Sequence, residues 1–267
     1  MAPPMDAKTR AQLNQVNRAF YEGTADAFSD TRRAPWPGWE RAMSHVSRSD
    51  AGPLSVLDAG CGNGRFAPYL AETEARTERG TKSCDIQYLG IDSSASLLAH
   101  AKQSYADLTW AEFREHDVLE LASDTPSDFG PFDLIVAFGV LHHVPGSEAR
   151  RGFLHDLVSL LSARGVLVVT AWQFGAVEHF TSRAIAWSDY NRGAEQSIDE
   201  AELEEGDYLL GFGSSPHPRY CHFTSAAELH ELFRDAPVTW VDEYCDDGKT
   251  QDLNRYAVVS RTGSSSN

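Results

Sequence analysis

Short apolar runs alternate with amphipathic segments along the middle of the chain. Apolar runs of the length of one buried strand occur at residues 54–60, 86–92, 112–118, 132–139 and 165–172. The segments between them have the three-to-four-residue apolar spacing of a helix, as residues 147–163 show with Leu154, Leu157 and Leu161. Strands that alternate with helices in this way form a parallel sheet with helices on both faces.

Both ends of the chain depart from this alternation. Apolar residues at helical spacing predict an N-terminal helix over residues 8–21, and Pro35 and Pro37 then require an extended linker. Near the other end, two apolar runs at 238–245 and 255–261 flank a turn-rich stretch and predict an antiparallel hairpin. The pattern therefore predicts an α/β fold: a doubly wound, mostly parallel seven-stranded sheet with an antiparallel edge hairpin.

Residues 174–222 do not follow the alternation, because their aromatic residues are scattered among acids and glycines. We expect an insertion on the substrate side of the fold, and an irregular surface excursion is the alternative. The predicted organisation is a helix and Trp-Pro linker covering the site over residues 1–50, then a main domain over 51–260 that contains the insertion. A disordered tail is expected over 261–267.

Composition limits the class of protein. A chain of 267 residues with 42% hydrophobic residues can bury one substantial core, and its formal charge of −16 disfavours an extended basic surface for nucleic acid. The four cysteines show no C-x-x-C spacing, so we expect reduced thiols and no metal. The longest apolar runs are far short of the roughly 18 residues of a membrane span, so we expect a cytoplasmic protein with no membrane partner.

The strongest candidate for a ligand site is the stretch VLDAGCGNGR at residues 56–65. An apolar strand ends on Asp58, and glycines alternate directly afterwards at Gly60, Gly62 and Gly64. In an open parallel sheet, ligands bind at the carboxyl ends of the strands, and glycines let the backbone approach them closely. A dinucleotide site would have its third glycine at position 65, which is Arg65, so the spacing disfavours a nicotinamide-dependent dehydrogenase.

This spacing resembles that of the Rossmann-like (class I) S-adenosylmethionine-dependent methyltransferases. Three further motifs occur in the family's order: LGID ending at Asp92, EHDV containing Asp117, and FDLIVAFGVLHHV at residues 132–144. The resemblance implies S-adenosylmethionine as cofactor, with Asp58 near its ammonium group, Asp92 on the ribose hydroxyls and Asp117 beside the adenine. Capping of a following helix is the alternative role for Asp92 and Asp117. The residues expected to bind the cofactor are Asp58, Gly60, Cys61, Gly62, Asn63, Gly64, Asp92, Ser93, Asp117, Val118 and Phe138.

A closer resemblance, to the tRNA wobble-uridine carboxymethyl methyltransferases, extends over most of the chain. It is carried by AFSDTRRAPWPGW at 27–39, by the glycine turn, by VLHHV and by RYCHFTSAAELHELF at 219–233. The resemblance implies methyl esterification of carboxymethyluridine in tRNA and a small activator subunit as partner. It also implies that Arg32 contacts the cofactor or the substrate carboxylate, and that Arg219, Tyr220 and His222 line the acceptor side.

Two departures from that family keep a second acceptor class open. Ala27 stands where the family typically has histidine, and an acidic stretch at 199–207 replaces the basic insertion of the eukaryotic members. The alternative is therefore a small-molecule or peptide O-methyltransferase on the same scaffold, acting on a small carboxylate-bearing substrate. A cofactor-binding regulatory module is a further alternative, and it would lack a formed acceptor pocket.

The acceptor determines which residues the chemistry requires. An ionised carboxylate is already nucleophilic, so Arg32 or Arg219 need only hold it in place, whereas a phenol or amine would need His142 or His222 as a base. The adjacent side chains of His142 and His143 should point apart, and we expect His142 to face the pocket. The predicted catalytic residues are Arg32, His142, Arg219 and Tyr220.

Overall fold

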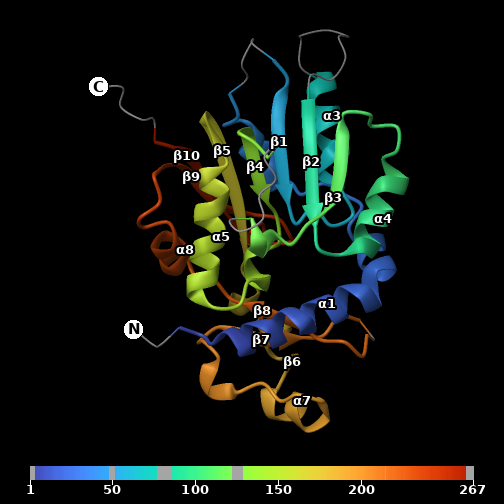
Figure 1. Cartoon of the computed structure of the whole chain (residues 1–267), viewed down its shortest axis with the longest axis vertical. Coiled ribbons are helices and arrows are strands. Elements are labelled where there is room, and N and C mark those ends of the chain that lie inside the picture. The colour runs from blue at the N-terminus through green and yellow to red at the C-terminus, as the bar shows by residue number, and fades with distance from the viewer. Residues whose placement is uncertain (1–3, 48–51, 77–85, 122–128, 214, 263–267) are drawn as a thin grey trace.

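The computed structural model describes residues 4–47, 52–76, 86–121, 129–213 and 215–262. Seven strands form the main sheet in the order β3-β2-β1-β4-β5-β10-β9 (Figure 1). Strands β1 to β5 are parallel, and β10 is antiparallel to both of its neighbours. The fold class predicted from the sequence is confirmed. The strands are β1 Leu54–Ala59, β2 Ile86–Asp92, β3 Ala111–Glu115, β4 Phe132–Ala137, β5 Leu161–Trp172, β9 Val238–Asp246 and β10 Asn254–Arg261.

Helices cover both faces of this sheet because the inner strands are apolar on both sides. On one face, Leu57 and Ile135 pack against α5 (Ser147–Ser159) and α8 (Ala226–Leu232). On the other face, Val56 and Leu134 pack against three helices. These are α2 Gly38–Met43, α3 Phe66–Arg76 and α4 Ala95–Ser104.

Helix α1 (Ala7–Asp30) lies across one end of the main sheet (Figure 1). Asp6 caps its first turn by accepting a hydrogen bond of 2.7 Å from the Thr9 amide. The predicted end at residue 21 is wrong, because Thr24 and Ala25 are also buried and keep the second half of the helix packed. The linker is also not extended throughout, since α2 begins directly after Pro37, where proline is compatible with a helix start.

Residues 174–222 form a second, three-stranded antiparallel sheet in the order β6-β7-β8. Its strands are Ala184–Ile185, Asp207–Leu210 and Arg219–His222, and α1 packs against it beside the main sheet (Figure 1). Strands of two to four residues leave too short a pattern to be recognised in the sequence. The short helices here are α6 Glu178–Thr181, α7 Trp187–Gly193, η3 Phe174–Ala176 and η4 Glu200–Glu202.

Two further expectations are revised. The helix predicted over 147–163 ends at Ser159, because Leu161 already pairs with Phe132 as the first residue of β5. The disordered tail expected from residue 261 falls mostly, from residue 263 on, outside the described residues. Within the described ranges, no helix combines the length and apolar character needed to cross a membrane.

Candidate active site

Two adjoining cavities lie at the carboxyl ends of the parallel strands. The glycine-turn cavity, of about 180 Å³, lies between the turn after β1, the end of β2 and helix α1. The arginine cavity, of about 620 Å³, lies between the Trp-Pro linker, the ends of β4 and β5 and the second sheet. Tyr21, Phe28, Phe138 and Gly139 line both cavities. Ligands bound in the two cavities would therefore lie next to each other.

The glycine turn leaves backbone exposed to the first cavity. Gly60, Gly62 and Gly64 all have positive φ, at 76°, 55° and 75°. A Cβ on Gly60 would lie 2.1 Å from Val140, and one on Gly64 would lie 2.6 Å from the Phe113 ring. Around Gly62 a Cβ would meet only Leu97, at 4.0 Å, so this glycine leaves open space on the cavity wall.

Asp92 both shapes the turn and faces the cavity. Its Oδ2 accepts a 2.8 Å hydrogen bond from the Gly62 amide, and its Oδ1 accepts one of 2.9 Å from Ser94. Ser94, not Asp92, caps α4, since the Leu97 amide donates to the Ser94 hydroxyl. Burial raises the pKa of Asp92. The capping alternative for Asp92 is therefore not what the structure shows.

Asp117 also lines the cavity, and it does cap a short helix. Its Oδ1 accepts from the Leu119 amide at the start of η1 (Val118–Glu120), and its Oδ2 accepts a 2.8 Å hydrogen bond from Arg18 of α1. The two acids thus follow neighbouring strands, are held by backbone amides and line the same cavity. Such fixed carboxylates suit the hydroxyl and amino groups of a nucleoside.

The other predicted cofactor residues divide into two groups. Four of them line neither cavity: Asp58, Cys61, Asn63 and Gly64. Asp58 is 3% exposed and accepts a 2.6 Å hydrogen bond from Tyr88, and burial raises its pKa to about 7. Its carboxylate therefore lies behind the turn, away from the cavity it was expected to face. The remaining residues, Gly60, Gly62, Asp92, Ser93, Asp117, Val118 and Phe138, line the glycine-turn cavity.

Helix α1 contributes cavity residues that sequence analysis did not identify. Asn14, Asn17, Arg18 and Tyr21 line the glycine-turn cavity together with Phe28. The first four repeat at the three-to-four-residue spacing of one helix face, which is the signal that could have revealed them. These polar side chains therefore mark the side of α1 that faces the glycine-turn cavity.

The second cavity is strongly cationic for a protein with a formal charge of −16. Arg32, Arg65, Arg183 and Arg219 line it, and Asp247 is the one carboxylate among its described lining residues. Arg65 stacks over Trp36 with 4.7 Å between guanidinium carbon and ring centroid, and donates to the Ala34 carbonyl. Burial and the neighbouring Arg32 lower its pKa to about 10.

Arg219 and Arg32 have no anionic partner among the residues that the structure describes. Arg219 is 6% exposed, lies 4.9 Å over Trp172, and makes no ion pair with any described residue; its buried Nε has no hydrogen-bond partner. The Arg32 guanidinium lies 4.2 Å over Phe28 and donates to the Thr31 hydroxyl. Burial and the charge of Arg219 lower the pKa of Arg32. An anion between these two cations would relieve both the burial cost and the repulsion.

The side chains of the two adjacent histidines do not point apart as expected, since their ring centroids are 4.1 Å from each other, but they line different cavities. His142, which is buried, lines the arginine cavity, and its Nδ1 has no hydrogen-bond partner. Burial, the neighbouring His143 and the arginines hold the pKa of His142 well below 6.5, so the ring is neutral. His143 lines the glycine-turn cavity; its Nδ1 donates to the Tyr220 carbonyl, and its Nε2 accepts from the Tyr21 hydroxyl. Burial lowers the pKa of His143 to about 3.

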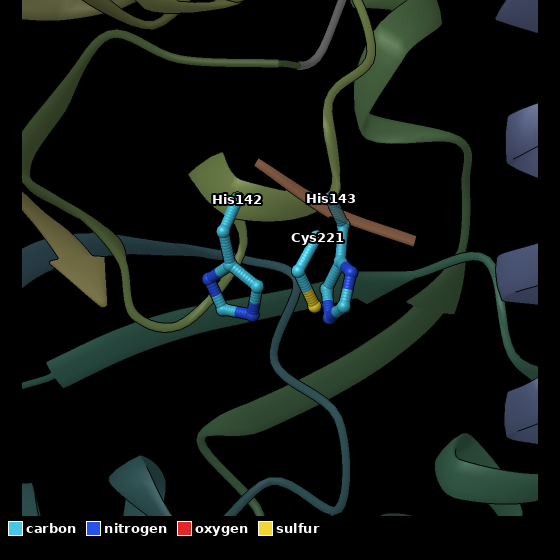
Figure 2. Close-up of side chains that lie close together, drawn as sticks. All are labelled: His142, His143 and Cys221. Carbon is cyan, nitrogen blue, oxygen red and sulfur yellow. The ribbon is translucent and has the colours of Figure 1, made fainter. Parts of the chain in front are cut away.

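His142 and His143 lie close to Cys221 of β8 (Figure 2), with possible ligand atoms within 4.8 Å of one another. The chemistry around these side chains does not favour a metal ion. Both nitrogens of His143 are hydrogen-bonded, and burial raises the pKa of the Cys221 thiol to about 12. The positive charge of Arg219 acts on all three groups and would repel a cation.

Tyr220, expected on the acceptor side, lies elsewhere. Successive side chains of a strand point to opposite faces, so Arg219 points to the arginine cavity while Tyr220 points away from it. The Tyr220 ring is fully buried beside Leu13 and Val16, and its hydroxyl donates to Asp207 at 2.7 Å. His222 points the same way as Tyr220 and is enclosed by carboxylates. Neither residue lines the arginine cavity.

A sheet of this strand order, with a glycine turn after β1 and carboxylates after β2 and β3, is the arrangement of class I S-adenosylmethionine-dependent methyltransferases. Residues 57–167 match the methyltransferase domain family. These residues therefore resemble a methyltransferase domain, and the sheet around them has the Rossmann-like fold of solved methyltransferases. It is 29% identical, over 195 residues and 73% of its length, to tRNA (carboxymethyluridine(34)-5-O)-methyltransferase of Xenopus tropicalis.

The coverage of these relatives is partial. The chain spans 25% of the Xenopus protein and 35% and 21% of the next two curated relatives. Among solved structures, CcbJ methyltransferase from Streptomyces caelestis has a TM-score of 0.61 at 16% identity, covering 93% of this chain and 99% of that one. Magnesium protoporphyrin IX methyltransferase from Synechocystis PCC 6803, solved with bound S-adenosylmethionine, has a TM-score of 0.56 at 14% identity, covering 93% and 96%. These structural likenesses establish the fold.

Proposed function

We propose that this protein transfers a methyl group from S-adenosylmethionine to a carboxylate, and that the acceptor is carboxymethyluridine at the wobble position of tRNA. The observation that carries the proposal is the pair Arg32 and Arg219. Both guanidinium groups line the arginine cavity and have no anionic partner among the described residues. A carboxylate is the acceptor that such a pair binds best.

The residues of the glycine-turn cavity fit the cofactor. Asp92 would accept the ribose hydroxyls, Asp117 would lie beside the adenine amino group, and the open backbone at Gly62 would allow close approach. When bound, S-adenosylmethionine supplies an electrophilic methyl group on a positively charged sulfur. The walls that both cavities share, Tyr21 and Phe138 among them, would bring the acceptor next to that methyl group.

The protonation states in the arginine cavity suit an acceptor that is already ionised. A carboxylate has lost its proton at neutral pH and needs no base, whereas a phenol or an amine must lose one. The pKa of His142 is held well below 6.5, so this ring is a weak base. Arg219 and Arg32 would instead hold and orient the carboxylate, and the surrounding aromatic rings would exclude water.

The names of two curated relatives state carboxymethyluridine as their substrate, and this supports the same acceptor here. The cavity also offers Trp36 and Phe212 as surfaces for stacking a base. The second candidate is a small carboxylate-bearing molecule or peptide, and the formal charge of −16 favours it, because RNA binding normally requires a basic surface.

The experiment that tests the proposal compares two acceptors that differ only in charge. Purified protein, with and without the small activator subunit implied by the resemblance, is incubated with S-adenosylmethionine and tRNA bearing either carboxymethyluridine or carbamoylmethyluridine. We expect methylation of the carboxylate and none of the neutral amide. Equal labelling of both tRNAs would contradict a carboxylate acceptor, and labelling only of small acids would favour the second candidate.

A further inference from the structure

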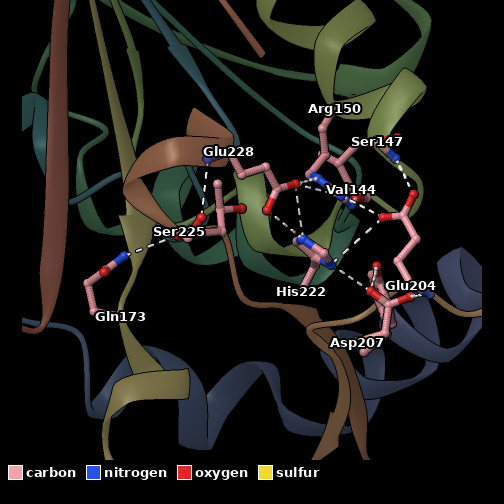
Figure 3. Close-up of polar contacts among 11 residues, drawn as sticks. Val144, Ser147, Arg150, Gln173, Glu204, Asp207, His222, Ser225 and Glu228 are labelled. Atoms are coloured by element: carbon pink, nitrogen blue, oxygen red, sulfur yellow. Dashed lines mark hydrogen bonds and ion pairs between the residues drawn. The ribbon is translucent and has the colours of Figure 1, made fainter. Parts of the chain in front are cut away.

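A buried ionic network joins the second sheet to the helices of the main domain. We call it the anchor network; Figure 3 shows its five residues, Arg150, Glu204, Asp207, His222 and Glu228. Arg150 of α5 is 1% exposed, and its Nη2 donates to Glu204 at 2.6 Å and to Glu228 at 2.8 Å. Glu228 belongs to α8, whereas Glu204 and Asp207 belong to the insertion. The network therefore spans two parts of the chain that pack together.

His222 lies at the centre of this network with a carboxylate on each side. Its Nδ1 is 2.7 Å from Asp207 Oδ1, and its Nε2 is 3.1 Å from both oxygens of Glu228. Ionised carboxylates only accept hydrogen bonds, so both ring nitrogens must carry protons for both contacts to form. The geometry is therefore that of an imidazolium ion, although His222 is 2% exposed.

The charges around His222 support its protonated form. Two cations, Arg150 and His222, face three carboxylates, those of Glu204, Asp207 and Glu228. Burial acts to lower the pKa of His222, but the hydrogen bonds to Asp207 and Glu228 outweigh it and raise that pKa above 6.5. The possible metal ligands here are Glu204, Asp207 and His222, and two of them already have other partners: Glu204 pairs with Arg150, and His222 lies between Asp207 and Glu228.

The anchor network fixes the strand that carries Arg219. Asp207 Oδ1 accepts hydrogen bonds from both Tyr220 and His222, the two residues of β8 that point away from the arginine cavity. The Tyr220 backbone is held as well, since its amide donates to Asn17 of α1 and its carbonyl accepts from His143. Arg219 is the residue directly before Tyr220, and it has no ion pair with a described residue to hold it. Its position therefore depends on how β8 is fixed.

We propose that the anchor network is a positioning device in which the imidazolium of His222 holds strand β8 so that Arg219 faces the acceptor. The part of this inference that concerns the acceptor rests on the proposed function. Loss of the proton from His222 leaves a ring nitrogen lone pair against a carboxylate and one positive charge among three negative ones. Strand β8 then becomes more mobile, and Arg219 no longer holds a carboxylate in line with the methyl group of the cofactor.

Two readouts test the positioning role without an acceptor. The first is the ring ¹⁵N spectrum of the wild-type protein, in which we expect both ring nitrogens of His222 to carry protons at pH 7. The second is hydrogen exchange in residues 207–222 of the His222→Gln variant, expected to accelerate about tenfold or more because a buried charged hydrogen bond is lost. His230→Gln is the matched control, since His230 of α8 is half exposed and pairs with Glu243.

The acceptor is then used for a third readout. His222→Gln should raise the KM for the carboxylate acceptor about tenfold and leave the dissociation constant of S-adenosylmethionine unchanged, since no network residue lines the glycine-turn cavity. Tyr220→Phe removes only the hydroxyl bond to Asp207 and should act in the same direction but more weakly. It also replaces His222→Gln if that variant does not fold.

The possible outcomes separate the two proposals. A His222 ring with one unprotonated nitrogen at pH 7, or unchanged exchange in the variants, would overturn the positioning role. Accelerated exchange with unchanged KM would overturn the link between β8 and the acceptor. If the ¹⁵N and exchange results are as expected but no carboxylate is methylated, the proposed function fails, whereas the anchoring of β8 is supported.

Discussion

Arg219 is buried against Trp172 and Phe20 without a charged partner among the described residues. Burying an uncompensated cation costs free energy, and proteins usually neutralise such a group within the fold. Many carboxylates of the described residues lie at the surface, yet none of them pairs with Arg219. We infer that the ligand supplies the negative charge.

Replacing Arg219 with lysine tests the bidentate contact that we infer. Lysine keeps the positive charge but loses the planar fork, so we expect the KM for a carboxylate acceptor to rise about 10- to 100-fold. Affinity for S-adenosylmethionine, measured by calorimetry, should not change, because Arg219 does not line the glycine-turn cavity. The control is Arg151→Lys, because Arg151 of α5 pairs with Glu231 of α8 and does not line the arginine cavity. An unchanged KM in Arg219→Lys would remove Arg219 from the acceptor site.

Asp92→Ala tests the placement of the cofactor. The variant loses both the carboxylate on the cavity wall and its hydrogen bond to the Gly62 amide. We expect the affinity for S-adenosylmethionine to fall about 100-fold or more, since two or more hydrogen bonds to a charged group are lost. Asp107→Ala, at an exposed position after α4, is the control. Unchanged affinity in calorimetry would show that the ribose does not bind at Asp92.

At the scale of elements, periodicity predicted the seven strands of the main sheet because each is long enough to show its pattern. It did not predict β6, β7 and β8, which have two to four residues each. Because β8 was not predicted, the sequence did not show on which side of that strand Tyr220 lies, and we expected it on the acceptor side. The side depends on the pairing of β8 with β7, which the sequence does not reveal. The glycine motif lies at the glycine-turn cavity, but the sequence did not distinguish Gly62, on the cavity wall, from Gly64, packed against Phe113.

The glycine turn gives a contrast between two substitutions. Gly62→Ala and Gly64→Ala both place a side chain at positive φ, at an expected cost of about 1 kcal/mol. Only Gly64→Ala adds a clash with Phe113 and Ala101, so its melting temperature should fall further. Gly62→Ala should fold but bind S-adenosylmethionine more weakly, because its methyl group enters open space at the cavity. Equal losses of stability and of binding in the two variants would contradict this division.

At the scale of the whole molecule, the anchor network predicts how stability depends on pH. The pKa of His222 is raised above 6.5 in the folded protein, so its contribution to stability is fully present below pH 6.5 and is lost as pH rises through the raised pKa. The free energies of unfolding of the wild type and of His222→Gln are measured with urea from pH 5.5 to 9. The difference between the two free energies should become smaller as pH rises. The raised pKa of Asp58 affects the unfolding free energy of both proteins equally, so it cancels when the two free energies are subtracted. A difference that stays constant with pH would contradict a charged His222.

The chemical nature of the product tests the central claim most directly. Protein and methyl-labelled S-adenosylmethionine are incubated with tRNA containing carboxymethyluridine and, separately, with a mixture of small acids, and the labelled products are treated with mild alkali. A methyl ester is hydrolysed under these conditions, so we expect the label to be released as volatile methanol. Label that withstands alkali would mean transfer to nitrogen, carbon or an ether oxygen, and would contradict a site built around Arg32 and Arg219 for a carboxylate.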